Sequence, residues 1–145
     1  MTSAQDTGAH NLNSQHSVLA KAILRVLCAC PDIGLALLFG SLAESAARND
    51  SDLDLAVDAG RRLTAQEKMD LISDLAQATG RPIDLVDIQA IGEPLLGQIV
   101  RHGKRILGTD EQYAALIRRH LFDAADFLPY RDRILAERRR AWIGK

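Results

Sequence analysis

The chain has 145 residues, enough for one domain, and 47% of them are hydrophobic, which excludes a wholly disordered protein. The net charge is −1, but residues 112–145 carry eight Lys/Arg against four Asp/Glu, whereas residues 1–111 carry ten against fifteen. No apolar run reaches membrane-spanning length and no secretory signal is recognisable, so we expect a cytoplasmic protein that has no membrane partner.

The first regular element that the pattern predicts is a helix. Residues 1–16 are polar and contain few large apolar side chains, which is typical of a flexible tail. From Ser17 to Cys30 apolar residues recur at helical spacing, and Pro31 is expected to end this helix. Cys28 and Cys30 are too close in sequence to form a good disulfide, and we expect no redox role for them.

Strands and helices then alternate through the middle of the chain. Residues 34–40, GLALLFG, form a short apolar run between glycines and predict a buried strand. Residues 41–48 are rich in alanine and favour a helix. Residues 51–58, SDLDLAVD, alternate strictly between polar and apolar side chains and predict a second strand.

Cap signals indicate where the next helix begins and ends. Thr64 and Glu67 have the spacing of a capping box, and Gly80 is a suitable C-cap. Residues 81–88, RPIDLVDI, predict a third strand, and residues 93–102 predict a helix with Pro94 near its first turn.

The last part of the chain is expected to be mainly helical. Residues 103–108 predict a short edge strand, and residues 110–128 and 130–142 predict two helices separated at Pro129. The whole order indicates an α/β (α+β) fold, in which a small sheet is covered by helices.

Three aspartates interrupt apolar strand patterns. Asp52 and Asp54 are two residues apart on one predicted strand, so they share a face, while Leu53 and its apolar neighbours point to the core. Asp84 interrupts the following strand and would stand beside this pair if the two strands are neighbours. Three such acids suit two Mg²⁺ ions, because hard divalent cations prefer carboxylate oxygens. Asp87 points to the opposite face and is interpreted as a surface or loop residue.

Gly40 and Ser41 stand between a predicted strand and a predicted helix. Backbone N–H groups at a helix start bind phosphate, Gly40 permits close approach, and the Ser41 hydroxyl can donate to a phosphate oxygen. The alternative reading is an ordinary Ser N-cap. The combination with the three acids favours the phosphate site.

Gly40-Ser41, ten residues, then Asp52-Leu53-Asp54 resembles the GS-x10-D-x-D signature of the nucleotidyltransferase superfamily related to DNA polymerase beta. The chain looks in particular like the minimal nucleotidyltransferases, and residues 81–107 are similar to their third strand and the elements after it. The resemblance implies a mixed nucleotidyltransferase sheet and a catalytic core at residues 17–108.

The resemblance also implies roles for these residues. Asp52 and Asp54 would be metal ligands, and Asp84 would be the third acid and the base for the attacking hydroxyl. Gly40 and Ser41 would hold the terminal phosphates of the nucleotide. Many relatives read GS-x-A-R-G, whereas Glu44 and Ser45 replace the Arg and the second Gly here, which bears on rate and nucleotide affinity.

The core leaves little chain for an acceptor-binding domain, so the acceptor is expected to be a macromolecule. In the resembled family, minimal nucleotidyltransferases act as antitoxins that transfer AMP from ATP to a tyrosine of a HEPN ribonuclease toxin. Two alternatives remain: a non-catalytic antitoxin that neutralises its toxin by binding, and a nucleotidyltransferase that modifies small molecules such as aminoglycosides. Partner identity, nucleotide preference and the number of AMP units added are left open.

The C-terminal segment, residues 109–145, is a candidate partner-binding region. It gathers arginines beside Trp142, and both residue types are enriched at protein interfaces. The alternative is a basic amphipathic helix packed on its own domain. Direct nucleic-acid binding is not favoured, because residues 1–111 are acidic and only 4% of the chain is aromatic. Assembly into a homo-oligomer is left open.

Overall fold

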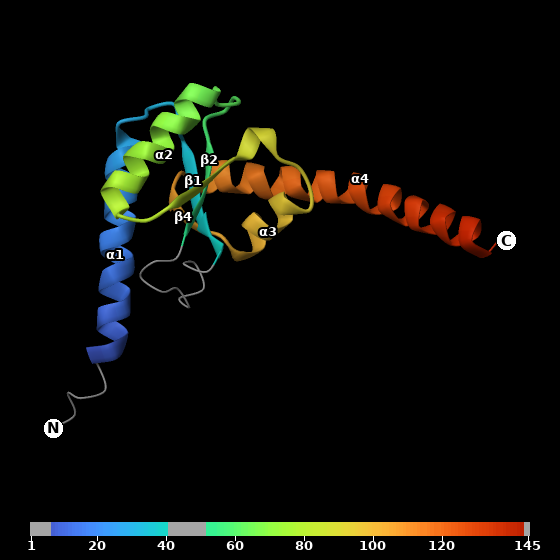
Figure 1. The fold of residues 1–145 in the computed structure, drawn as a ribbon, viewed down its shortest axis with the longest axis horizontal. Coiled ribbons are helices and arrows are strands. Elements are labelled where there is room, and N and C mark those ends of the chain that lie inside the picture. The colour runs from blue at the N-terminus through green and yellow to red at the C-terminus, as the bar shows by residue number, and fades with distance from the viewer. Residues whose placement is uncertain (1–6, 41–51, 144–145) are drawn as a thin grey trace.

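The computed structural model describes residues 7–40 and 52–143, and within them strands alternate with helices (Figure 1). All four predicted strands are confirmed, each slightly shorter than expected, whereas the helix predicted at 41–48 lies outside the described residues. No helix in the described part of the chain is long and apolar enough to cross a membrane. In chain order the elements are α1 (Thr7–Cys28), β1 (Leu35–Phe39), β2 (Leu53–Asp58), α2 (Ala65–Thr79), β3 (Ile83–Asp87), the short 3-10 helix η2 (Ile88–Ala90), α3 (Leu95–His102), β4 (Lys104–Leu107) and α4 (Asp110–Ile143).

The strands form one mixed sheet in the order β3-β2-β1-β4. β1 pairs antiparallel with both β2 and β4, while β2 and β3 run parallel. β4 therefore occupies an edge, as its short length predicts. β3 lies directly beside β2, which was the condition for Asp84 to join the other acids.

Helices cover both faces of this sheet, with α1 and α2 on one side and α3 and α4 on the other (Figure 1). Leu53, Leu55 and Val57 point to the α1–α2 side, where they are fully buried, as predicted. The opposite face is also a core, because Ala56 is fully buried there among residues of α3 and α4. The apolar layers on both faces hold the sheet rigidly, and the acids belong to β2 and β3 of this sheet.

The ends of α2 follow the predicted cap chemistry. The Thr64 side chain accepts a hydrogen bond from the Glu67 N–H, and the Glu67 carboxylate accepts one from the Thr64 N–H. Gly80 ends the helix with φ of 67°, a left-handed conformation that glycine adopts without strain. Arg61 adds an ion pair to Glu67 at 2.7 Å.

α1 begins earlier than expected. The tail predicted for residues 1–16 is helical from Thr7 onward, so the helix is longer at its N-terminus and ends at Cys28. The physical reason is that a helix nucleated by its packed segment extends at little cost, even through polar residues.

α4 corrects the prediction of two C-terminal helices. One helix runs from Asp110 to Ile143, and Pro129 does not divide it. Proline removes one backbone hydrogen bond and crowds the preceding turn. Good helix formers such as Leu, Ala, Arg and Glu on both sides continue the helix through it.

Candidate active site

The strand register places the predicted acids at one end of the sheet. Asp54 on β2 is the antiparallel partner of Phe39, the last residue of β1. On its other side Asp54 is the parallel partner of Asp84 on β3. Because neighbouring strands lie about 4.8 Å apart, the end of β1 and both carboxylates meet at one edge.

Gly40 lies against the Asp54 carboxylate. Its φ is 75°, a left-handed conformation. A Cβ built on Gly40 would lie 2.0 Å from Asp54 Oδ2, so even an alanine would collide with the acid. Backbone conformation therefore favours glycine here, and a larger residue would also have to displace the Asp54 carboxylate.

Burial raises the pKa of the Asp54 carboxyl, and a hydrogen bond with the Asp84 side chain raises it further. The negative charges of Asp84 and Asp52 act in the same direction. The three acids thus form one electrostatic unit, in which the charged form of Asp54 is destabilised by its burial and by the neighbouring negative charges. A positive charge between the three acids would offset this destabilisation.

The donor chemistry of Asp54 and Asp84 fits a divalent cation, because both offer carboxylate oxygens on adjacent rigid strands. Asp52 is exposed and lies one residue before β2, close enough to influence Asp54. Within residues 7–40 and 52–143, no three Asp, Glu, His or Cys side chains already converge as a metal-binding group. The structure therefore brings Asp54, Asp84 and Gly40 together and leaves Asp52 beside them. Ser41, Glu44 and Ser45 lie outside the described residues.

Asp87 is buried, with only 4% exposed, so its interpretation as a surface or loop residue is wrong. Its carboxylate accepts hydrogen bonds from the Leu63 N–H at 2.8 Å and from the Gln89 N–H at 3.0 Å. It thereby caps η2 and ties the end of β3 to the segment before α2. The signal available in the sequence was an Asp at the start of a helical turn.

A buried polar network fixes the connection that follows β3, and sequence analysis did not find it. His120 Nδ1 on α4 lies 2.5 Å from Glu93 Oε1, and Glu93 also accepts from the Gly97 N–H. Arg119 donates to the carbonyl oxygens of Ile88 and Ile91. No local pattern could have revealed these pairs, because the partners are far apart in sequence.

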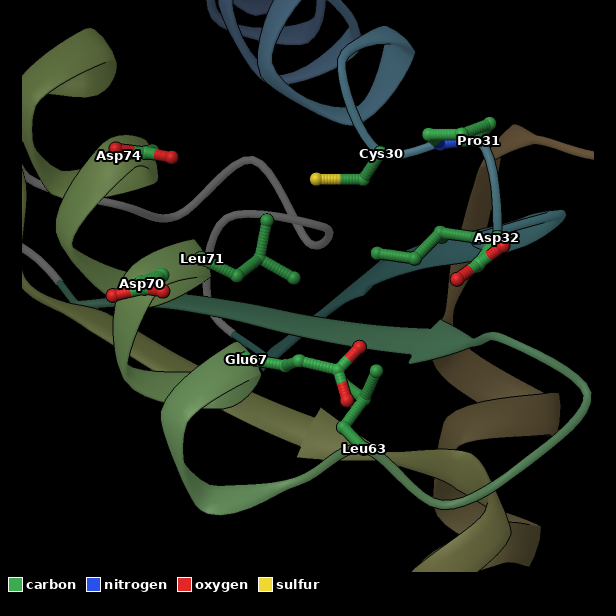
Figure 2. Close-up of a pocket in the computed structure, with 9 residues that line it drawn as sticks. Cys30, Pro31, Asp32, Leu63, Glu67, Asp70, Leu71 and Asp74 are labelled. Carbon is green, nitrogen blue, oxygen red and sulfur yellow. The ribbon is translucent and has the colours of Figure 1, made fainter.

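A cavity of about 240 Å³ lies at the other end of β1, between the end of α1 and α2 (Figure 2). Cys30 and the acids Asp32, Glu67, Asp70 and Asp74 line it. Burial raises the pKa of the Cys30 thiol, and the charge of Asp74 raises it further, so the thiol remains protonated and unreactive. Its lining includes neither Gly40 nor Asp52, Asp54 or Asp84, so the cavity is separate from the acid site.

A family model for polymerase beta nucleotidyltransferases matches residues 21–112, which include β1 through β4 and both carboxylates. The chain therefore belongs to the polymerase beta nucleotidyltransferase family, as the sequence motif indicated.

The chain is similar to one named relative and to two solved structures. The chain is 35% identical to the protein adenylyltransferase MntA of Shewanella oneidensis over 81 residues, which span 56% of this chain and 58% of that relative. It also resembles a solved toxin–antitoxin structure with AMP-PNP, with a TM-score of 0.74 and 28% identity, covering 81% of this chain and 96% of that one. A complex of tri-AMPylated Shewanella oneidensis HEPN toxin with MNT antitoxin gives a TM-score of 0.72 and 25% identity, covering 84% and 97%. These likenesses agree with the predicted mixed sheet and helices of a minimal nucleotidyltransferase.

Proposed function

We propose that this chain is a Mg²⁺-dependent protein adenylyltransferase that serves as an antitoxin, transferring AMP from ATP to a tyrosine of a HEPN-type toxin. The observation that carries the proposal is the contact between Asp54, Asp84 and the backbone of Gly40 at one edge of the sheet. The likeness to MntA and to a complex that contains an AMPylated HEPN toxin supports the choice of nucleotide and acceptor.

In this proposal Asp52, Asp54 and Asp84 hold the metal, and the backbone at Gly40, with the Ser41 hydroxyl, binds the terminal phosphates of ATP. Bound Mg²⁺ would neutralise the phosphates and polarise the α-phosphate. Asp84 is exposed and therefore accessible to a protein acceptor. It would accept the tyrosine proton while the phenolic oxygen bonds to the α-phosphorus, and pyrophosphate would leave with the bridging oxygen.

The test uses labelled ATP, Mg²⁺ and the purified HEPN protein from the organism that encodes this chain. We expect label on the toxin with the unaltered chain, and a loss of at least about 100-fold in Asp54→Asn and Asp84→Asn. Asp70→Asn is the matched control, because Asp70 is an exposed acid of α2.

Two results would contradict the proposal. Transfer that survives both active-site substitutions would remove these residues from the site. If the Asp54→Asn variant neutralises the toxin as well as the unaltered chain does, the chain acts by binding alone, which is the non-catalytic alternative.

A further inference from the structure

The groups of the proposed active site lie in a row across one end of the sheet. Asp84 on β3 is the partner of Asp54 on β2, and Asp54 is the partner of Phe39 on β1, which Gly40 follows. In the proposed reaction Asp84 receives the proton of the acceptor, and pyrophosphate leaves on the side opposite the attacking oxygen. The terminal phosphates of the nucleotide therefore extend past Gly40 toward the next strand of the sheet, which is β4.

The turn between α3 and β4 reaches this end of the sheet. Lys104, the first residue of β4, is the antiparallel partner of Leu38, one residue before the end of β1. A Cβ built on Gly103 would lie 3.4 Å from Leu37 Cβ, so the end of α3 rests against β1. His102 is the last residue of α3 and therefore lies near the acid end of β1 and β4. Since β4 lies two strand spacings, about 10 Å, from β2, a bound triphosphate can span the gap.

The packing of α3 decides which of its sides faces the acids. α4 covers the other end of the sheet, because Arg119 donates to the carbonyl oxygens of Ile88 and Ile91, beyond the end of β3. A Cβ built on Gly97 would lie 2.8 Å from His120 Cε1, so this side of α3 faces α4. The side of α3 that is turned away from Gly97 therefore faces the acid end.

His102 and Arg101 are both exposed but lie on different sides of α3. Each residue advances a helix by about 100°, so His102 lies about 140° around α3 from Gly97, whereas Arg101 lies about 40° from it. His102 is also about 60° from the fully buried Ile99, at the border of the face that packs on the sheet. Of these two neighbouring basic residues, His102 is the one that borders the acid site.

We propose that His102 binds the terminal phosphates of the nucleotide from the β4 side of the site. This inference rests on the proposed function and adds to it a residue outside the sequence motif. An imidazole has one N–H donor when neutral and two when charged, and either form can donate to a phosphate oxygen. Because Asp52, Asp54 and Asp84 crowd negative charge at the other end of the row, a donor here draws the phosphates away from them and stabilises the leaving pyrophosphate.

The test measures binding of ATP and of AMP to the purified full chain with Mg²⁺, by isothermal titration calorimetry. His102→Ala should weaken ATP binding about fivefold to tenfold, because a hydrogen bond to a charged group is lost. AMP has no terminal phosphates and should bind this variant as tightly as the unaltered chain. His102→Arg should bind ATP as the unaltered chain does, since arginine restores an N–H donor.

Arg101→Ala is the matched control. It removes an exposed basic side chain from the same turn of α3, where a favourable interaction with the helix dipole would be shared by both residues. We expect this variant to bind ATP and AMP normally. In AMP transfer to the HEPN protein, His102→Ala should raise KM for ATP and weaken inhibition by pyrophosphate, and Arg101→Ala should change neither. Circular dichroism should be the same for all the variants.

The outcomes are distinguishable. Unchanged ATP binding in His102→Ala would show that the inference is wrong, and so would equal losses in His102→Ala and Arg101→Ala. Equal weakening of ATP and AMP would also contradict it, because His102 would then act elsewhere than at the terminal phosphates. If His102→Ala selectively weakens ATP binding but the unaltered chain transfers no AMP, the proposed function fails while the phosphate contact holds. If the unaltered chain binds no ATP, both fail.

Discussion

At the scale of single residues, the contact between Gly40 and Asp54 explains why a glycine precedes the acid strand in this family member. Gly40 has a left-handed φ of 75°, and a Cβ built on it would lie 2.0 Å from Asp54 Oδ2, so any side chain here would strain the backbone and displace the carboxylate. The Asp54 carboxylate lies beside Asp84, where burial and neighbouring charge raise its pKa. Backbone geometry and carboxylate chemistry are therefore coupled at one position.

Gly40→Ala tests this coupling. The added methyl group must displace the Asp54 carboxylate, so we expect AMP transfer to fall more than about tenfold. The strained φ should also cost about 1 kcal/mol in unfolding free energy. Gly60→Ala is the matched control, because Gly60 has φ of 73° but nothing within 4 Å of the built Cβ. It should lose similar stability and keep full activity, as measured by urea unfolding and labelled ATP. Equal losses of activity in both variants would show that the Asp54 contact is unimportant.

At the scale of elements, local chemistry defines α2 while long-range packing defines α4. The capping box of Thr64 and Glu67 and the C-cap at Gly80 are visible in the sequence and present in the structure. Pro129, in contrast, is a local stop signal that α4 overrides. α4 is secured at its first half by Leu116 and by the bonds of Arg119 to the connection after β3.

The capping box also predicts a pH dependence of stability. The ion pair with Arg61 and the bonds with Thr64 lower the pKa of Glu67 from 4.5 to about 2. A lowered carboxyl pKa contributes stability that is complete above pH 4.5 and is lost as the pH falls toward about 2. Glu67→Gln should therefore lower the urea midpoint at pH 7 and flatten its change between these two pH values. The exposed Glu111→Gln should leave the wild-type slope intact, and a wild-type slope in Glu67→Gln would contradict the assignment.

At the scale of the whole molecule, the sheet is clamped between two apolar layers, and the site forms where three of its strands meet. α3 and α4 close the second layer through the buried pair of Glu93 and His120, whose side chains are 7% and 11% exposed. The same pair ties the first half of α4 to the connection that follows β3. Rigidity at this point supports the acid site.

Glu93→Ala tests the clamp. It leaves the Gly97 N–H and the His120 ring without their acceptor in a buried place. We expect a loss of about 2–4 kcal/mol in unfolding free energy. The rate of amide hydrogen exchange should increase more in α3 and in the first half of α4 than in α2. Glu137→Ala, at an exposed site of α4, should change neither quantity. Unchanged exchange in Glu93→Ala would mean that apolar packing alone holds these helices.

The sequence by itself determined the strands, the caps of α2 and the acids that belong to one motif, because these depend on spacing within a few residues. It predicted that Asp54 and Asp84 would be neighbours, and the parallel pairing of β2 with β3 bears this out. Only the tertiary structure decided that Asp87 is buried and that α4 is continuous past Pro129. It also decided that Glu93 pairs with His120 across 27 residues. These features arise from contacts between distant segments, whose energies no local pattern encodes.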